Sequence, residues 1–93
     1  MTKAEEEYHA SLRKLGCIVC RNEGRGFVPC HVHHILRGGR RIDHMHCIGL
    51  CPSHHADGIN NDVAVSRHPW KRQFEKRYGT EEALLKQIEE LMK

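Results

Sequence analysis

Apolar residues recur at helical spacing near both ends of the chain but not in its centre. Tyr8 and Leu12 begin this pattern near the N-terminus, where the spacing predicts a helix over residues 3–15. Thr2 is typical of the N-cap in a capping box, and Gly16 is typical of the residue that ends a helix. We therefore expect a well-bounded helix before the centre of the chain begins.

The C-terminal part shows helical periodicity in two stretches, which together cover residues 66–93. Trp70, Phe74 and Tyr78 recur every four residues and predict one helix, with Pro69 in its first turn. Thr80 is expected to cap a last helix. The apolar face of that helix is formed by Leu84, Leu85, Ile88, Leu91 and Met92.

The centre of the chain is rich in glycine, histidine and cysteine, and its pattern is not helical. Residues 27–35 and 45–50 have the character of short strands, and residues 52–57 are expected to form a short helix. This order of elements predicts a small α+β fold with residues 1–93 in a single domain.

Composition indicates that a hydrophobic core alone would stabilise this fold only weakly. Only 39% of the 93 residues are hydrophobic and 5% are aromatic, so a structural metal is a natural source of stability. The formal net charge of +3 is compatible with a nucleic-acid partner. No segment is long and apolar enough to cross a membrane, the N-terminus does not resemble a signal peptide, and we expect a cytoplasmic protein.

Two pairs of metal-binding residue types have the spacing of a structural zinc site. Cys17 and Cys20 form a CxxC motif, and Cys51 and His54 form a CxxH motif farther along the chain. Each motif can place two ligands on one tight turn, and two such turns complete the tetrahedron that structural Zn²⁺ requires.

Two further cysteines leave the fourth ligand open. Cys30 or Cys47 could replace His54, although packing in the core is the favoured interpretation of both.

The histidines exceed what one zinc ion needs. His31, His33 and His34 lie within four positions, and His46 and His55 follow. Phosphodiester hydrolysis would use such residues, because it needs a base that activates water and a cation that stabilises charge on the phosphate. Histidine titrates near neutral pH, and neutral imidazole binds divalent transition metals.

Other polar residues have plainer interpretations. We expect His9, His44 and His68 to be solvent-exposed histidines. Asp43 is either an acceptor for a ligand histidine or an exposed loop carboxylate.

The segments around these histidines resemble HNH endonucleases, also called ββα-metal or His-Me finger nucleases. The resemblance is carried by residues 33–35 and 46–55, and covers residues 17–82 overall. Residues 48–55 and 74–81 look in particular like the phage Ref-type recombination-enhancement nucleases, which act with a RecA filament. The resemblance implies a zinc-stabilised ββα-metal core over residues 17–57, with flanking N- and C-terminal helices.

The same resemblance implies a metal-dependent DNA endonuclease of phage or prophage origin, linked to recombination in a bacterial host cell. His34 matches the general base, and His33 and His55 match the ligands of the catalytic ion. His46 stands where the family has an asparagine that orients the base, so it could orient the base, bind metal or act in catalysis. His31 remains an alternative ligand if the strand register is shifted by two residues.

The resemblance also assigns two kinds of metal ion. Cys17, Cys20, Cys51 and His54 match the four structural zinc ligands. The catalytic divalent ion could be Mg²⁺, Mn²⁺, Ni²⁺ or Zn²⁺, and a site with only nitrogen ligands favours the transition metals over Mg²⁺.

Two basic stretches are candidate DNA-binding residues. Arg37, Arg40 and Arg41 surround a glycine pair between the two expected strands, and Lys71 and Arg72 lie in the later helix. The aromatic residues of that helix could stack on bases, but a core position is the favoured interpretation. Two alternatives to a nuclease remain: a non-catalytic zinc-stabilised DNA-binding or adaptor module, and a degenerate nuclease that is active only with a recombinase.

Overall fold

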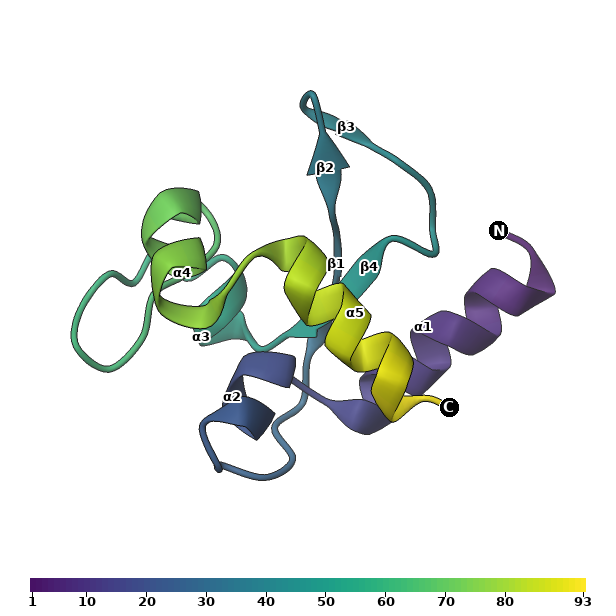
Figure 1. The fold of residues 1–93 in the computed structure, drawn as a ribbon, viewed down its shortest axis with the longest axis horizontal. Coiled ribbons are helices and arrows are strands. Elements are labelled where there is room, and N and C mark those ends of the chain that lie inside the picture. The colour runs from purple at the N-terminus through teal and green to yellow at the C-terminus, as the bar shows by residue number, and fades with distance from the viewer.

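A pair of antiparallel strands forms the centre of the computed structural model, which describes all 93 residues (Figure 1). Strand β1 (His31–His34) pairs with β4 (Cys47–Leu50). Between them, β2 (Leu36–Arg37) and β3 (Arg40–Arg41) form a small second hairpin that projects from the rest of the molecule. Helix α3 (Pro52–His55) follows β4 directly and packs against both β1 and β4.

Four further helices surround these strands. Helix α1 (Lys3–Leu15) packs against β1 and β4, and α5 (Glu81–Leu91) also packs against β4. Helix α2 (Ile18–Asn22) contacts β4. Helix α4 (Lys71–Tyr78) is drawn directly above α3 in Figure 1. None of these helices is long and apolar enough to span a bilayer.

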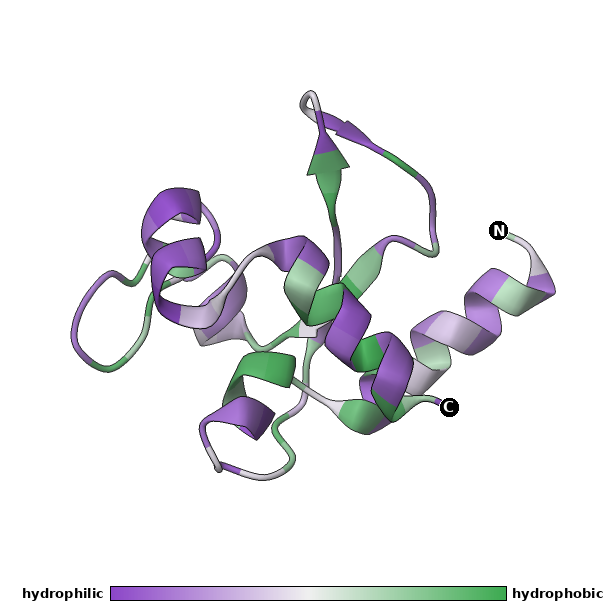
Figure 2. Ribbon diagram, in the orientation of Figure 1, coloured by the Kyte–Doolittle hydropathy of each residue, from purple (hydrophilic) through white to green (hydrophobic).

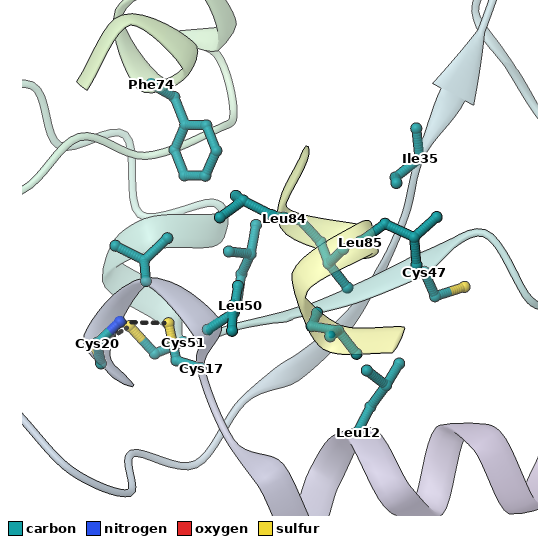
Figure 3. Packing of buried hydrophobic residues seen from close by; sticks show 14 of the residues in the cluster. Leu12, Cys17, Cys20, Ile35, Cys47, Leu50, Cys51, Phe74, Leu84 and Leu85 are labelled. Atoms are coloured by element: carbon teal, nitrogen blue, oxygen red, sulfur yellow. Dashed lines mark hydrogen bonds between the residues drawn. The ribbon is translucent and has the colours of Figure 1, made fainter. Parts of the chain in front are cut away.

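The core is a single cluster of buried apolar side chains between the strands and the helices (Figure 3). Leu12, Ile48, Leu50, Phe74 and Ile88 are among its fully buried members. Burial of such a side chain stabilises the fold by about 1.5–3 kcal/mol. Figure 2 shows the contrast with α4, which is hydrophilic along most of its length.

The predicted bounds of the N-terminal helix and the predicted start of the last helix are confirmed. The Thr2 amide donates to Glu5 Oε1 at 2.7 Å, and the Glu5 amide donates to Thr2 Oγ1 at 3.2 Å, which completes the capping box. The Ala83 amide donates to Thr80 Oγ1 at 3.1 Å, so Thr80 caps α5 as expected. The antiparallel strands confirm an α+β fold, although both strands are shorter than predicted.

Two local predictions are wrong. The centre was expected to contain no helix before residue 52, yet α2 begins at Ile18. Its N-cap is Cys17, whose Sγ accepts a hydrogen bond from the Cys20 amide at 3.4 Å. Helix α4 was expected to include Pro69 but begins at Lys71. The segment before α4 does not join the helix, because the amides of residues 67 and 68 donate to carbonyl groups of α3.

The aromatic residues of α4 divide between core and surface. Phe74 is fully buried, and Tyr78 is half-buried with its hydroxyl accepting from the Val65 amide at 3.1 Å. Trp70 is 36% exposed and donates from Nε1 to the Gly58 carbonyl. The core position expected for these rings is therefore correct for Phe74 and not for Trp70.

Strand β4 approaches the end of α1 closely at Gly49. A Cβ atom at this position would lie 2.7 Å from Cys30 Sγ and 2.9 Å from the Gly16 carbonyl oxygen. We predict that Gly49→Ala lowers the free energy of unfolding by about 1–3 kcal/mol, because the backbone at Gly16 must move. Denaturant unfolding measures this loss.

The double variant Cys30→Ala/Gly49→Ala is the control. It removes the sulfur but leaves the Gly16 carbonyl in place, so it should recover only part of the lost stability. Unchanged stability of Gly49→Ala would contradict the close packing of β4 against the end of α1.

Candidate functional site

The first cluster of metal-binding side chains joins α2 to α3. Cys17 is the N-cap of α2, and Cys20 lies in its first turn. Cys51 is the N-cap of α3, and His54 lies within that helix. All four side chains are buried, and their ligand atoms lie within 4.8 Å of one another. Figure 3 shows the three cysteines converging at one edge of the core.

The spacing of these atoms fits a tetrahedral zinc ion. Bond lengths of about 2.3 Å to sulfur and 2.0 Å to nitrogen put sulfur pairs about 3.8 Å apart and sulfur–nitrogen pairs about 3.5 Å apart. The Sγ atoms of Cys20 and Cys51 are 3.7 Å apart. His54 Nδ1 lies 3.7, 3.6 and 3.1 Å from the sulfurs of Cys17, Cys20 and Cys51.

The other nitrogen of His54 also suits a metal ligand. Its Nε2 is buried without a hydrogen bond, and it faces Glu23 Oε1 at 3.7 Å. A carboxylate beyond the ring orients a ligand histidine and increases its basicity.

Burial raises the pKa of the Cys17 and Cys20 thiols, because charged sulfur is poorly solvated there. Several buried thiolates can therefore lie together only if a cation balances their negative charge, and a zinc ion supplies that positive charge.

The two alternative cysteine ligands lie elsewhere. Cys30 Sγ donates to the Leu12 carbonyl at 3.4 Å, and Cys47 Sγ donates to the His44 carbonyl at 3.3 Å. Figure 3 shows Cys47 at the opposite side of the core from Cys20. His54, rather than either of these cysteines, is the fourth residue that the structure brings to the cluster.

A second cluster consists of three imidazole rings. His33 lies on β1, His55 ends α3, and His68 lies in the segment before α4. The ring centroids are 5.1 Å apart for His33 and His55, 5.2 Å for His33 and His68, and 5.3 Å for His55 and His68. One nitrogen from each ring lies within 4.8 Å of the others, so this trio could hold a metal ion.

The expectation that His68 is a solvent-exposed histidine is wrong. Its side chain is half-buried, and its amide donates to the His55 carbonyl at 2.8 Å. This hydrogen bond brings the segment before α4 alongside α3. Sequence reasoning missed His68 because no spacing rule relates a residue in an irregular segment to a strand 35 positions earlier.

A buried carboxylate holds one ring of this trio. His33 Nε2 lies 2.5 Å from Glu81 Oε2, and Arg67 Nε donates to Glu81 Oε1 at 3.0 Å. His33 and Glu81 are both only 3% exposed. Burial opposes the charge on Glu81, but the hydrogen bond from His33 and the charge of Arg67 lower the pKa of this carboxyl. With Nε2–H donated to Glu81, Nδ1 of His33 has its lone pair free.

Nothing in the sequence marks Glu81 and Arg67 as neighbours of a candidate metal ligand. In the sequence, Glu81 is an acidic residue in the first turn of a helix, where its charge is favourable, and this is equally true of its neighbour Glu82. Only the packing of α5 against the strands distinguishes the buried glutamate from the exposed one.

His34 lies beside His33 in sequence but has different neighbours. Its Nε2 is 3.1 Å from His44 Nδ1, and its ring contacts the ring of His9 in α1 edge-on. Burial lowers the pKa of His34, and the positive charge of Arg41 lowers it further. His34 is therefore a neutral imidazole near pH 7.

His34 and the imidazole trio open into one cavity. Its volume is about 320 Å³. The cavity is lined by Val32, His33, His34, Leu36, Arg41, His55 and His68. A candidate base, a candidate metal site and an arginine therefore face the same space.

The structure does not bring His46 to His34. His46 Nδ1 lies 3.1 Å from Asp43 Oδ1, and His46 does not line the cavity. Asp43 accepts from the amides of Met45 and His46 at 2.8 Å, so it holds a turn and does not contact a ligand histidine. The role predicted for His46 stays a prediction, and His44 is the residue in contact with His34.

Two other expected solvent histidines are also corrected. His9 is 4% exposed, and its Nε2 lies 2.6 Å from the His44 carbonyl. His44 is half-buried between His9 and His34. Both belong to the surroundings of His34 because the turn before β4 folds back onto α1.

His31 does not belong to the imidazole trio. It is exposed, and its Nδ1 is 3.3 Å from His55 Nδ1. His33, two positions later on the same face of β1, is the strand residue that faces both His55 and His68.

The basic residues predicted to contact DNA are exposed. Arg37, Arg40 and Arg41 lie on the β2–β3 hairpin, and Arg41 also lines the cavity. Lys71 and Arg72 lie in the first turn of α4, soon after His68.

Comparison with known proteins gives one match. The family model described as "Recombination enhancement, RecA-dependent nuclease" matches residues 1–93. No curated protein and no solved structure matches the chain significantly.

The fit of the first cluster to zinc leads to a prediction about metal content. We expect the purified protein to carry one tightly held zinc ion, because three thiols and His54 already surround a tetrahedral centre. Cys17→Ala should lose this zinc and unfold near room temperature, since binding energy of this kind is folding energy. Elemental analysis and circular dichroism measure the two effects.

His33→Ala is the matched control, because it changes the second cluster only. It should retain one zinc per chain and its helical signal. Loss of the zinc from His33→Ala, or its retention in Cys17→Ala, would contradict the assignment.

Proposed function

This chain belongs to the recombination enhancement, RecA-dependent nuclease family, and on that premise we propose that it is a metal-dependent DNA endonuclease of the HNH type. The observation that carries the proposal is the common cavity of His34 and the imidazole trio. In this proposal residues 1–93 form a single nuclease domain, in which β1, β4 and α3 are the ββα-metal core.

The imidazole trio would hold the catalytic ion. His33, His55 and His68 offer three nitrogen ligands, which favours Zn²⁺, Ni²⁺ or Mn²⁺ over Mg²⁺. A divalent ion bound there supplies positive charge for the scissile phosphate and the leaving oxygen.

His34 would act as the general base. As a neutral imidazole in the cavity it can take a proton from a water molecule, which then attacks the phosphorus. Its contact with His44 fixes the orientation of the ring. We retain His46 as a candidate for an auxiliary role, to be decided by experiment.

Glu81 is proposed as a positioning residue. It accepts the Nε2 hydrogen bond of His33 and is held in turn by Arg67. A buried carboxylate of this kind fixes which ring nitrogen is free to bind metal.

DNA would approach over the β2–β3 hairpin. Arg41 reaches the cavity, and Arg37 and Arg40 extend the positive charge along the hairpin. Lys71 and Arg72 offer further phosphate contacts. Such contacts position a duplex or single strand without reading its sequence. The family description makes a RecA filament the proposed partner, and a phage or prophage origin remains part of the proposal.

The structural zinc proposed at Cys17, Cys20, Cys51 and His54 would hold this arrangement together. His54 lies in α3, the helix that also carries His55, and Cys51 is the N-cap of that helix. The zinc therefore fixes the place of one ligand of the catalytic ion.

The test of the base is plasmid nicking with Mn²⁺, Ni²⁺ or Mg²⁺, with and without a RecA filament. We predict that His34→Ala reduces the rate by about 10²–10⁴-fold and leaves zinc content and folding unchanged. His46→Ala is the matched variant, and we expect a reduction below about tenfold because its ring binds Asp43 outside the cavity.

Two results would overturn this assignment. Equal activity of wild type and His34→Ala would remove His34 as the base. DNA binding without cleavage under every metal, with and without RecA, would favour the non-catalytic DNA-binding module instead.

The test of Glu81 is the metal dependence of nicking. We predict that Glu81→Gln raises the metal concentration for half-maximal activity by about 10–100-fold, because His33 loses its charged partner. Saturating metal should restore most of the maximal rate. A variant that loses maximal rate without a change in metal dependence would contradict the positioning role.

A further inference from the structure

A third group of metal-binding side chains lies on the other side of the strand pair. His9 of α1, His34 of β1 and Cys47 of β4 each offer one ligand atom, and these atoms lie within 4.8 Å of one another. His34 and Cys47 are directly opposite each other in the β1–β4 register, so their side chains share a face.

Each side chain of this group contacts one atom of His44. Burial explains the position of Cys47 as a small core residue, but it does not explain why two imidazoles lie beside it. His9 Nε2 and Cys47 Sγ both contact the His44 carbonyl oxygen, at 2.6 and 3.3 Å. His44 Nδ1 lies 3.1 Å from His34 Nε2, but His44 is not among the residues whose ligand atoms lie within 4.8 Å of one another.

We propose that His9, His34 and Cys47 form an inhibitory metal site, which takes a borderline-soft divalent ion such as Zn²⁺ or Co²⁺. Two imidazoles and one thiolate prefer such ions, and hard ions such as Mg²⁺ prefer oxygen ligands. The inhibitory part rests on the proposed function, because it requires His34 to be the base. The metal site itself does not.

The site explains how an ion would stop the reaction. A ring nitrogen of His34 that coordinates a metal has no lone pair left for a proton. Binding at Cys47 releases the thiol proton to solvent, so one proton leaves for each ion bound. Burial raises the pKa of Cys47 to about 11, so the ion must compete with a firmly held proton. We expect weaker binding here than at the Cys17 cluster, because this group offers three ligands and the Cys17 cluster offers four.

The ion can reach the site from the cavity side. His34 lines the cavity, and His34 and His44 are only half-buried. Closure around an ion needs His34 and His44 to rotate about their side-chain bonds, which half-buried rings can do without moving β1 or β4.

The direct test is titration of the zinc-loaded protein with Co²⁺, followed by absorption. Thiolate–cobalt coordination gives a near-ultraviolet charge-transfer band, whereas cobalt on the imidazole trio gives visible bands alone. We expect the band in wild type and its loss in Cys47→Ser, whose hydroxyl still reaches the His44 carbonyl. Cys30→Ser is the matched control, because Cys30 is also a free thiol bonded to a backbone carbonyl, and it should keep the band. Zinc release, followed with a chromophoric chelator, shows whether cobalt has displaced the structural ion.

A band of equal strength in Cys47→Ser, or no band in wild type, would overturn the site. His9→Gln provides a second variant: it should weaken cobalt binding by about tenfold or more, since one of three ligands is gone. Unchanged binding in that variant would also contradict the site.

The inhibition is tested by adding Zn²⁺ to nicking assays that are supported by Mn²⁺. Wild type and Cys30→Ser should lose activity about tenfold or more, and Cys47→Ser should resist. Equal inhibition of all three proteins would overturn the inhibitory role. If no protein nicks DNA under any condition, the proposed function fails, and the cobalt band alone then decides whether the metal site exists.

Discussion

Adjacent residues of a β-strand point to opposite faces, and the chemistry proposed for this protein depends on that constraint in β1. His33 points toward α3 and α5, where it meets His55, His68 and Glu81. His34 points toward α1 and meets His9 and His44. Two neighbouring histidines thus enter separate environments, one suited to a metal ion and one to a neutral base. His33 and His34 both line the cavity, which opens at the end of the strand.

Helix α3 connects the two candidate metal clusters. His54 and His55 are consecutive, and consecutive helical residues point about 100° apart, so one ring faces the cysteines and the other faces His33. The carbonyl groups of the same two residues accept hydrogen bonds from the amides of Arg67 and His68. One turn of helix therefore orders the cysteine cluster, the imidazole trio and the arginine that holds Glu81. A change that displaces the cysteine cluster should also displace the imidazole trio, because both include residues of this helix.

Local signals predicted most of the fold. The capping box at Thr2 and the N-cap Thr80 are contacts between residues three positions apart, so the sequence contains both partners. The start of α4 was not predictable in this way. It depends on hydrogen bonds from the preceding segment to α3, and these bonds join residues 13 positions apart that share no pattern. The helix over Ile18–Asn22 escaped detection because it is one short turn, and its start depends on the Cys17 sulfur.

The sequence by itself determined the chemical types available and those sites whose ligands come in closely spaced pairs. Cys17 with Cys20 and Cys51 with His54 could be recognised because each pair occupies a single turn, whose geometry is local. Only the tertiary structure decided which isolated histidines lie beside His33 and His34. His9, His44 and His68 have no neighbour in sequence that marks them, and the packing of α1, of the turn before β4 and of the segment before α4 gives each its position. Glu81 became a partner of His33 for the same reason: burial against a distant strand is set by the whole fold and by no local pattern.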